Sequence, residues 1–160
     1  MTSQNLAGKH VLITHADAFM GPTLCAVFAE HGAVVIADSS PLLAPEAPAA
    51  LVESAGIVDI LVVNLALPAP STPATEVSDA EWAQVFATLV DPLPRLVRAV
   101  LRQMIARRSG KILVMGSASA LRGMKRASTY SAARGAQLAY VQAVGVEVAP
   151  HNVQVNAIAQ

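Results

Sequence analysis

Short runs of apolar residues alternate along the chain with longer segments that have helical spacing. Five runs, rich in valine and isoleucine, have the length of β-strands: His10–Thr14, Val34–Ala37, Ile60–Val63, Ile112–Met115 and Val153–Ala157. Because these runs are largely apolar, both faces of each strand are expected to be covered. Strands that alternate with helices predict an α/β fold of the Rossmann type, a doubly wound parallel sheet with helices on both faces.

The segments between these strands carry helix signals of different strength. A first helix is predicted from about Met20 to His31, and Gly32 is placed to close it in the left-handed conformation. Ser128–Ala149 is predicted as one long helix that ends at the following proline. The stretch Ser39–Pro48 contains three prolines, and it is predicted as an irregular surface connection.

A further helix is predicted before the fourth strand. Ser78 followed three residues later by Glu81 is a capping-box pattern, which is typical of a helix N-terminus. Pro92 and Pro94 should kink or interrupt this helix before it resumes toward Arg107, because proline removes a backbone donor and clashes with the preceding turn.

Composition limits the classes of function. Of the 160 residues, 54% are hydrophobic and 14% are charged, which argues against disorder. The 11 Lys and Arg residues balance 11 Asp and Glu residues, so a small neutral ligand fits better than nucleic acid or an anionic membrane. The single cysteine, Cys25, cannot form an internal disulfide, and no secretory signal is recognised, so a cytoplasmic location is expected. The longest apolar run, Ile60–Ala69, is far short of the roughly 20 residues that span a bilayer.

The turn after the first predicted strand lacks the glycines of a dinucleotide site. A pyrophosphate must approach backbone N–H groups at a helix N-terminus with no side chain in the way. Here an aromatic ring at Phe19 would occupy that space, and the carboxylate of Asp17 would repel a phosphate. Binding of NAD or NADP is therefore disfavoured on steric and electrostatic grounds.

Three residues have a spacing that directs them to one cleft. Ser117 follows the strand Ile112–Met115, Tyr130 lies thirteen residues later, and Arg134 follows Tyr130 by four. Residues four apart share a helical face, so Tyr130 and Arg134 can point into the same cleft, which Ser117 enters from the neighbouring strand end. A phenol has a pKa near 10 and is a poor base at neutral pH unless a fixed cation favours the phenolate. Arg134 would supply such a cation.

Both patterns resemble the halohydrin dehalogenases, which are cofactor-independent relatives of the short-chain dehydrogenases. The dehydrogenases have Thr-Gly-x-x-x-Gly-x-Gly at the turn and Tyr-x-x-x-Lys on the helix, whereas the dehalogenases have an aromatic residue at the turn and arginine on the helix. At the turn, Thr14, Phe19 and Gly21 match the dehalogenase pattern. On the helix, Arg134 matches the dehalogenase arginine. Leu89 is a further departure, because it stands where the dehydrogenases have a proton-relay asparagine.

The resemblance implies a lyase that converts vicinal haloalcohols to epoxides and halide, and that opens epoxides with halide, azide, cyanide or nitrite. Ser117 would bind the substrate hydroxyl, Tyr130 would remove its proton, and Arg134 would keep Tyr130 poised for the transfer. The pocket for the halide or nucleophile would include Phe19, Thr14 and Gly21. No nucleotide cofactor and no metal ion is implied.

The resemblance also bears on assembly and on the extent of the chain. Relatives form homotetramers by packing two long helices, here about Ser78–Arg107 and Ser128–Ala149. The chain is expected to be a single Rossmann-like domain, 1–160, without the family's C-terminal substrate and halide-pocket segment. Gln160 falls where the dehydrogenases begin a Pro-Gly segment.

Two other functions are compatible with these residues. One is an NAD(P)-dependent short-chain dehydrogenase or reductase with a degenerate glycine loop, and the other is a non-catalytic binding protein on the same fold. Ser119 is an alternative to Ser117 as the substrate-binding hydroxyl, although the thirteen-residue spacing favours Ser117. Asp38 is expected to be a turn or cap residue, and Asn64 a sheet-bracing residue. Structural or surface roles are expected for His15, Ser131 and Tyr140, and Cys25 on the first helix is expected to be a small buried residue.

Overall fold

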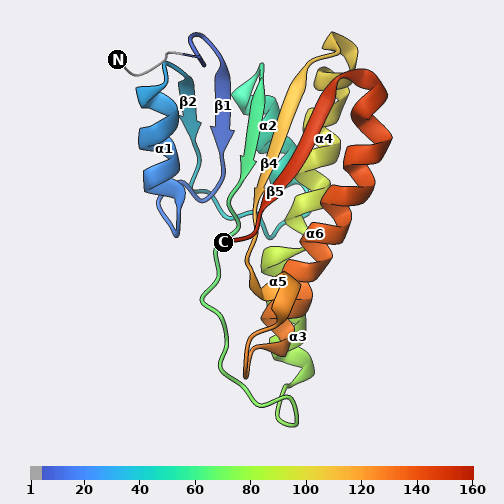
Figure 1. Ribbon diagram of the computed structural model, residues 1–160. Helices are drawn as coiled ribbons and strands as arrows, with labels where there is room; N and C mark the ends of the chain where they lie inside the picture. Colours follow the sequence, from blue (N-terminus) through green and yellow to red (C-terminus); the bar gives the residue numbers. More distant parts are fainter. Residues whose placement is uncertain (1–4) are drawn as a thin grey trace.

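One parallel sheet organises the computed structural model, which describes residues 5–160 (Figure 1). Its five strands are β1 (His10–Ile13), β2 (Val34–Ala37), β3 (Ile60–Val63), β4 (Gly110–Met115) and β5 (Val153–Ile158). They pair in the order β2-β1-β3-β4-β5, and every pairing is parallel. The predicted Rossmann-type sheet is therefore confirmed. The largest difference from the predicted bounds is at β4, which begins at Gly110 instead of Ile112.

Helices cover both faces of the sheet. They are α1 (Gly21–Glu30), α2 (Ala47–Ala55), α3 (Asp79–Leu89), α4 (Pro92–Arg107), α5 (Ser119–Arg122) and α6 (Ser128–Val148), followed by a short 3-10 turn, Ala149–His151. α1 lies on one face, and α2, α4 and α6 lie on the other (Figure 1). Within residues 5–160, none of these helices has the length and apolar character needed to cross a bilayer.

Two apolar cores follow from the alternation of side chains along each strand. Leu12 and Leu61 belong to the larger core, which they share with buried residues of α4 and α6. Their sequence neighbours Val11 and Val62 point to the opposite face and pack with residues of α1. β3 is buried at every position because each face of the sheet has its own helical layer there. The expectation that both faces of each strand are covered is wrong for β5, which exposes Gln154 and Asn156 at the edge of the sheet.

The helix before β4 is interrupted as the prolines predicted. The Ser78 hydroxyl oxygen accepts a hydrogen bond from the Glu81 N–H at 3.1 Å, and α3 begins at the next residue after Ser78. α3 ends before Pro92, which occupies the first turn of α4, where a missing N–H leaves no helical bond unmade. The Glu81 carboxylate accepts hydrogen bonds from the hydroxyls of Thr72 and Thr129, which gives this residue a second structural role.

One predicted connection contains the start of a helix. α2 begins at Ala47, inside the stretch Ser39–Pro48 that was predicted to be irregular, so that prediction is wrong at its end. Pro48 lies in the first turn of α2, where proline is accepted, and Val52 on the same helix is buried. Gly32, by contrast, follows α1 with φ of 86°, as predicted for a helix that ends in the left-handed region.

The strand order places a crevice at the carboxyl ends of β1 and β3. The chain leaves β1 toward β2 on one side, and all later strands add on the other side. Ligands of such sheets bind at this point of reversal, outside the carboxyl ends of the strands. Thr14 follows β1, Asn64 follows β3, and the Asn64 N–H donates to the Thr14 hydroxyl oxygen at 3.0 Å. The candidate site is therefore built from the segments that follow β1, β3 and β4.

Candidate active site

The turn after β1 carries bulky side chains on backbone torsions that suit glycine. His15 has φ of 44° and Phe19 has φ of 55°. These left-handed values cost a residue with a Cβ about 1–2 kcal/mol, whereas glycine adopts them without a steric penalty. His15 and Phe19 stand where the dehydrogenase pattern has its first two glycines.

This turn does not fit a dinucleotide pyrophosphate. Phe19 is 54% exposed and lines the cavity beside the turn, so its ring occupies the approach that a phosphate would need. Asp17 adds an exposed carboxylate to the same turn. Three backbone N–H groups of the turn already have carbonyl acceptors, those of Ala16, Ala18 and Gly21. In residues 5–160, His, Cys, Asp and Glu side chains also do not gather in threes as a metal site requires.

Gly21 is required by the turn itself. A Cβ placed on Gly21 would lie 2.5 Å from the carbonyl oxygens of both His15 and Ala16. Contacts this short involve backbone atoms, so they can be relieved only by moving the main chain. The glycine is explained by the packing of the turn, with no ligand needed.

Replacing Gly21 with alanine is therefore expected to destabilise the fold by about 1–3 kcal/mol, as other overpacking substitutions do. Urea unfolding of the variant would measure the loss. Gly135→Ala is the matched control, because a Cβ at this position on α6 meets nothing within 4 Å. We expect the control to be neutral or to stabilise by about 0.4–1 kcal/mol. Equal stability of the two variants would contradict this account of Gly21.

Asn64 ties the turn after β1 to the segment after β3. Its fully buried side-chain amide donates to the carbonyl oxygens of His15 and Ala18, each at 3.0 Å. Its backbone N–H donates to Thr14, whose side chain is also fully buried. The structural role predicted for Asn64 agrees with these contacts, but the side chain braces the turn and not the sheet.

Tyr130 and Phe19 line one cavity of about 440 Å³ at the carboxyl end of the sheet. The other lining residues are apolar and come from the turn and from the segment after β3: Ala18, Ala66, Leu67, Pro68 and Ala69. Within residues 5–160 the Tyr130 hydroxyl has no hydrogen-bond partner, although the residue is only 7% exposed. An apolar cavity with one phenol suits a small uncharged organic molecule. Of the predicted pocket residues, Phe19 lines this cavity, whereas Thr14 and Gly21 are buried and do not.

The start of α6 and the cavity wall are anchored together. The Thr129 hydroxyl donates to one carboxylate oxygen of Glu81 at 2.8 Å, and the Thr72 hydroxyl donates to the other at 2.7 Å. Thr129 precedes Tyr130, and Thr72 follows the wall segment 66–69. One carboxylate therefore fixes Tyr130 relative to the wall that it faces.

Arg134 is a buried cation beside Tyr130. Its guanidinium carbon lies 5.0 Å from the centre of the Tyr130 ring, and the residue is 1% exposed. The guanidinium donates to the Met115 carbonyl at 3.0 Å, the Leu65 carbonyl at 3.1 Å and the Gln137 side-chain oxygen at 3.0 Å. These contacts hold the charge in place against the aromatic ring.

The charge of Arg134 has no acidic partner in the described part of the chain. All three acceptors of its hydrogen bonds are neutral, and its Nε is buried without a partner. The ion pairs within residues 5–160 involve Asp59 and do not include Arg134. A buried charge of this kind is costly, and it favours an anion in its surroundings.

Ser117 shares its surroundings with Arg134. Both residues line a small cavity of about 10 Å³ between the end of β4 and α6. The Ser117 hydroxyl oxygen accepts a hydrogen bond from the Ser119 N–H at 3.2 Å, and the Ser119 hydroxyl is buried without a partner among the described residues. The structure thus brings Arg134 together with Tyr130 and with Ser117, while Tyr130 and Ser117 line different cavities.

The loop that carries Ser117 continues the sheet. The Gly116 N–H donates to the Ile158 carbonyl at 2.8 Å, and the Ala118 N–H donates to the Gln160 carbonyl at 2.7 Å. These bonds extend the pairing of β4 with β5 past the end of both strands. The position of Ser117 therefore depends on the residues that follow β5.

Sequence reasoning missed two residues of the site. Gln137 is 1% exposed, accepts from Arg134 and donates to the Leu89 carbonyl. A glutamine three residues after the candidate arginine, on the same helical face, was the available signal. His15 was assigned a structural or surface role, but its ring contacts the segment that forms the cavity wall.

Asp38, Cys25 and Tyr140 are found in structural roles, whereas the Ser131 hydroxyl is buried without a partner among the described residues. Asp38 accepts a hydrogen bond from the Ser40 hydroxyl at 2.7 Å, as a turn residue does. Cys25 packs half-buried in the core under α1, and this burial raises the pKa of its thiol. Burial also raises the pKa of Tyr140, against the opposing effect of Arg98.

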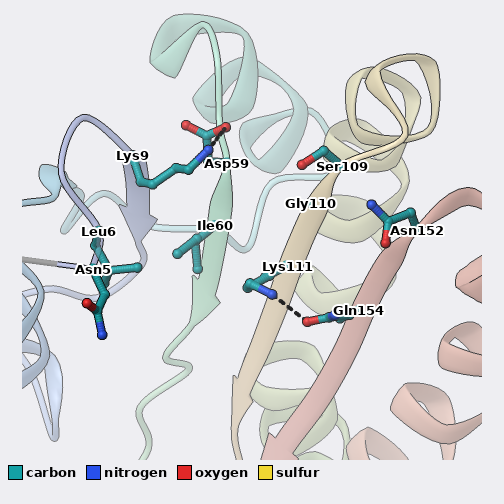
Figure 2. Close-up of a pocket in the computed structure, with 10 residues that line it drawn as sticks. All are labelled: Asn5, Leu6, Lys9, Asp59, Ile60, Ser109, Gly110, Lys111, Asn152 and Gln154. Atoms are coloured by element: carbon teal, nitrogen blue, oxygen red, sulfur yellow. Dashed lines mark hydrogen bonds and ion pairs between the residues drawn. The ribbon is translucent and has the colours of Figure 1, made fainter.

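A different cavity, of about 180 Å³, lies at the amino ends of the strands (Figure 2). Lys9 lies 4.0 Å from Asp59, and Lys111 donates to the Gln154 side chain, so the charged groups that line it already have neighbours. This end of a parallel sheet is opposite to the end where ligands of such folds bind. The cavity containing Phe19 and Tyr130 is therefore the candidate active site.

Comparisons with known proteins agree on the fold and differ on the activity. The family model described as short chain dehydrogenase matches residues 44–160. Among curated proteins, a 3-oxoacyl-(acyl-carrier-protein) reductase of Vibrio harveyi is 27% identical over 97% of this chain and 73% of its own length. A sorbitol dehydrogenase of Cereibacter sphaeroides is 33% identical over 89% of this chain and 53% of its own. Among solved structures, a "Dehalogenation enzyme" superposes with a TM-score of 0.88 at 28% identity, over 96% of this chain and 72% of that chain.

Proposed function

The chain belongs to the short chain dehydrogenase family, and we propose that within this family it is a halohydrin dehalogenase that needs no nucleotide cofactor. The observation that carries the proposal is the turn after β1, where Phe19 occupies the approach to the helix N-terminus and lines the same cavity as Tyr130. Arg134 in place of lysine beside Tyr130 supports it. The likeness to a solved dehalogenation enzyme adds support from outside the site.

The proposed reaction is an intramolecular displacement on a vicinal haloalcohol. Tyr130 removes the proton of the substrate hydroxyl. The resemblance assigns Ser117 a hydrogen bond to the same oxygen, although the two residues line different cavities of this structure. The resulting alkoxide oxygen forms a bond to the neighbouring carbon as the carbon–halogen bond breaks, and the electron pair of that bond leaves with the halide. The products are an epoxide, a halide ion and a proton held on Tyr130 that is later released to water. In reverse, Tyr130 protonates the opening epoxide while halide, azide, cyanide or nitrite attacks carbon.

Arg134 acts on Tyr130 and not on the substrate in this proposal. Its guanidinium is buried 5.0 Å from the ring centre, and its hydrogen bonds go to neutral groups of the chain. An ionised Tyr130 would be the anion that this uncompensated charge favours. The pair would then be neutral overall after the proton has left the phenol.

Phe19 and the apolar wall suit the leaving halide. The cavity beside Tyr130 is lined by alanine, leucine, proline and phenylalanine side chains, with no cation among them. A fixed positive charge there would hold the product strongly, whereas an apolar wall holds a halide weakly and permits release. The proposed substrates are therefore small haloalcohols and epoxides, together with small anions.

The curated relatives favour a second candidate, an NAD(P)-dependent dehydrogenase or reductase. Their names are those of reductases and dehydrogenases, and on names alone they support this candidate better than the dehalogenase. It would require the turn to admit a pyrophosphate against Phe19 and Asp17. A non-catalytic binding protein on the same fold is the third candidate.

Bromide release separates these candidates. Purified protein incubated with a small bromo-alcohol and no nucleotide is expected to release bromide, and fluorescence titration with NADH and NADPH is expected to show no saturable binding. Nucleotide binding together with reduction of a carbonyl substrate would replace the proposal by the second candidate. The absence of both bromide release and nucleotide binding would favour the binding protein.

A homotetramer built on α3, α4 and α6 is part of the same proposal. α3 exposes Trp82, which is 46% accessible and stacks on Phe86, and α6 exposes Val146, which is 80% accessible. Large apolar side chains left in solvent on these helices support their use as an interface.

A further inference from the structure

His15 joins the two segments that form the walls of the candidate cavity. One wall is the turn with Ala18 and Phe19, and the other is the segment 66–69 after β3. The imidazole Nδ1 of His15 accepts a hydrogen bond from the Ala66 N–H at 3.1 Å. This contact links residues 51 positions apart in the chain at the rim of the cavity.

The contact fixes the protonation state of the ring. An Nδ1 that accepts a hydrogen bond cannot carry a proton, so the proton of the neutral imidazole is on Nε2. An imidazolium would direct an N–H at the Ala66 N–H, and the hydrogen bond would be lost. The link from the His15 ring to Ala66 therefore exists only while His15 is neutral.

The backbone of His15 gives a second reason to look for a role of its side chain. Its φ of 44° is a left-handed value that glycine would adopt at lower cost. Strained residues of this kind gather at functional sites, where surrounding contacts hold them in place. The Asn64 amide, which donates to the His15 carbonyl at 3.0 Å, is one such contact.

We infer that His15 is a positioning residue, whose neutral ring holds the wall 66–69 against the turn of Phe19. It thereby keeps the cavity in the shape that the proposed reaction requires. The inference rests on the proposed function for its kinetic consequence. His15 does not line the cavity that contains Tyr130, so it acts through Ala66 and touches no reacting atom.

Burial sets the direction of the pKa shift of His15, and the charges around the ring oppose it. Burial is the largest effect and lowers the pKa of His15 below its ordinary value of 6.5, while Asp17 and Asp38 act in the opposite direction. His15 is half-buried. It also lines a largely apolar cavity with Pro41, Leu42, Leu43, Thr88 and Pro92. His15 is thus neutral at pH 7, and the link to Ala66 is lost on the acid side.

The lowered pKa of His15 also makes the stability of the folded chain depend on pH. The pKa of His15 is lower in the folded chain than the value of 6.5 expected when the chain is unfolded, so the unfolded chain binds the proton more tightly. The stability contributed by neutral His15 is complete above about pH 6.5 and is lost as the pH falls below it. The loss of the Ala66 contact accompanies this fall.

NMR of the purified protein tests the contact without any substrate. We expect an Nε2-protonated ring for His15 at pH 7.5, and we expect the Ala66 amide signal to titrate with the same midpoint as the ring. In His15→Asn, the asparagine side-chain oxygen is attached to Cγ as Nδ1 is, so it keeps an acceptor that does not titrate. In this variant the chemical shift of the Ala66 amide should stay constant over the pH range in which the His15 ring titrates in the wild type. An Nδ1-protonated ring, or an Ala66 amide that ignores the titration of His15, would overturn the inference.

Kinetics test the consequence for the cavity. His15→Gly keeps the backbone torsion and removes the acceptor, so kcat/KM for a bromo-alcohol at pH 7.5 is expected to fall about three- to tenfold, as for the loss of one hydrogen bond. His15→Asn should keep the wild-type value and lose less activity than wild type between pH 7 and pH 5. His10→Asn, at the other end of β1, is the matched control and should follow wild type. Full activity of His15→Gly, or an unchanged acid limb in His15→Asn, would remove His15 from the role. If wild type releases no bromide, the proposed function fails, while the NMR result still decides the contact.

Discussion

Replacing Tyr130 with phenylalanine is expected to abolish halide release from a bromo-alcohol while leaving the fold intact. The substitution removes one hydroxyl, which has no hydrogen-bond partner within residues 5–160, and it keeps the ring that packs against Arg134. The proposed general base is lost, so kcat should fall by about 10²–10⁴-fold. Initial rates of bromide release across a range of enzyme concentrations would measure the loss.

The other tyrosine of the chain supplies a control for this variant. Tyr140 lies on α6 as Tyr130 does, but it is not part of the candidate cavity. Tyr140→Phe is expected to release bromide at the wild-type rate, and both variants should unfold near the wild-type temperature. Retained activity in Tyr130→Phe would remove this residue as the base, and an equal loss in both variants would point to a general effect on α6.

Replacing Arg134 with alanine is expected to have two measurable effects. Bromide release should fall, because the buried cation that lies against the Tyr130 ring in the proposed mechanism is gone. The free energy of unfolding should also fall, since the Met115 and Leu65 carbonyls lose their donor, at about 1–3 kcal/mol for each group left unpaired. Bromide release from pH 5 to pH 10 and urea unfolding would measure the two effects separately.

Arg134→Lys separates charge from geometry. Lysine keeps a positive charge but cannot reproduce the planar set of donors that reaches Met115, Leu65 and Gln137 together. We expect a smaller loss of bromide release than in Arg134→Ala, with a similar loss of stability. Bromide release that stays at the wild-type rate in Arg134→Ala would show that the cation does not act on Tyr130.

The strands could be predicted because short runs rich in valine and isoleucine stand between longer helical segments. β2 and β3 have the predicted bounds, and runs such as Ile60–Val63 are buried at every position. The break between α3 and α4 was also predictable, because Pro92 can begin a helix and cannot continue one. α2 could not be predicted in the same way, because prolines indicate irregular structure in a sequence, whereas the first turn of a helix also accepts them.

The candidate site was predictable only where its residues share one element. Tyr130 and Arg134 are four apart on α6, so helical geometry alone predicts that they lie together, as the structure shows. The bonds from Arg134 to Leu65 and from Ala66 to His15 cross between loops distant in sequence. No periodicity in the sequence specifies the path of such loops, so the partners of Arg134 and His15 could be found only from the three-dimensional structure.

The torsions of the turn after β1 have a consequence for how activities diverge on this scaffold. His15 and Phe19 already have the left-handed torsions that glycine prefers, so glycine at either position would require no rebuilding of the main chain. Gain or loss of room for a coenzyme at this point is thus a matter of two point substitutions, with no insertion or deletion. A lineage, natural or evolved in the laboratory, can change the fit of this turn to a coenzyme by a short mutational path.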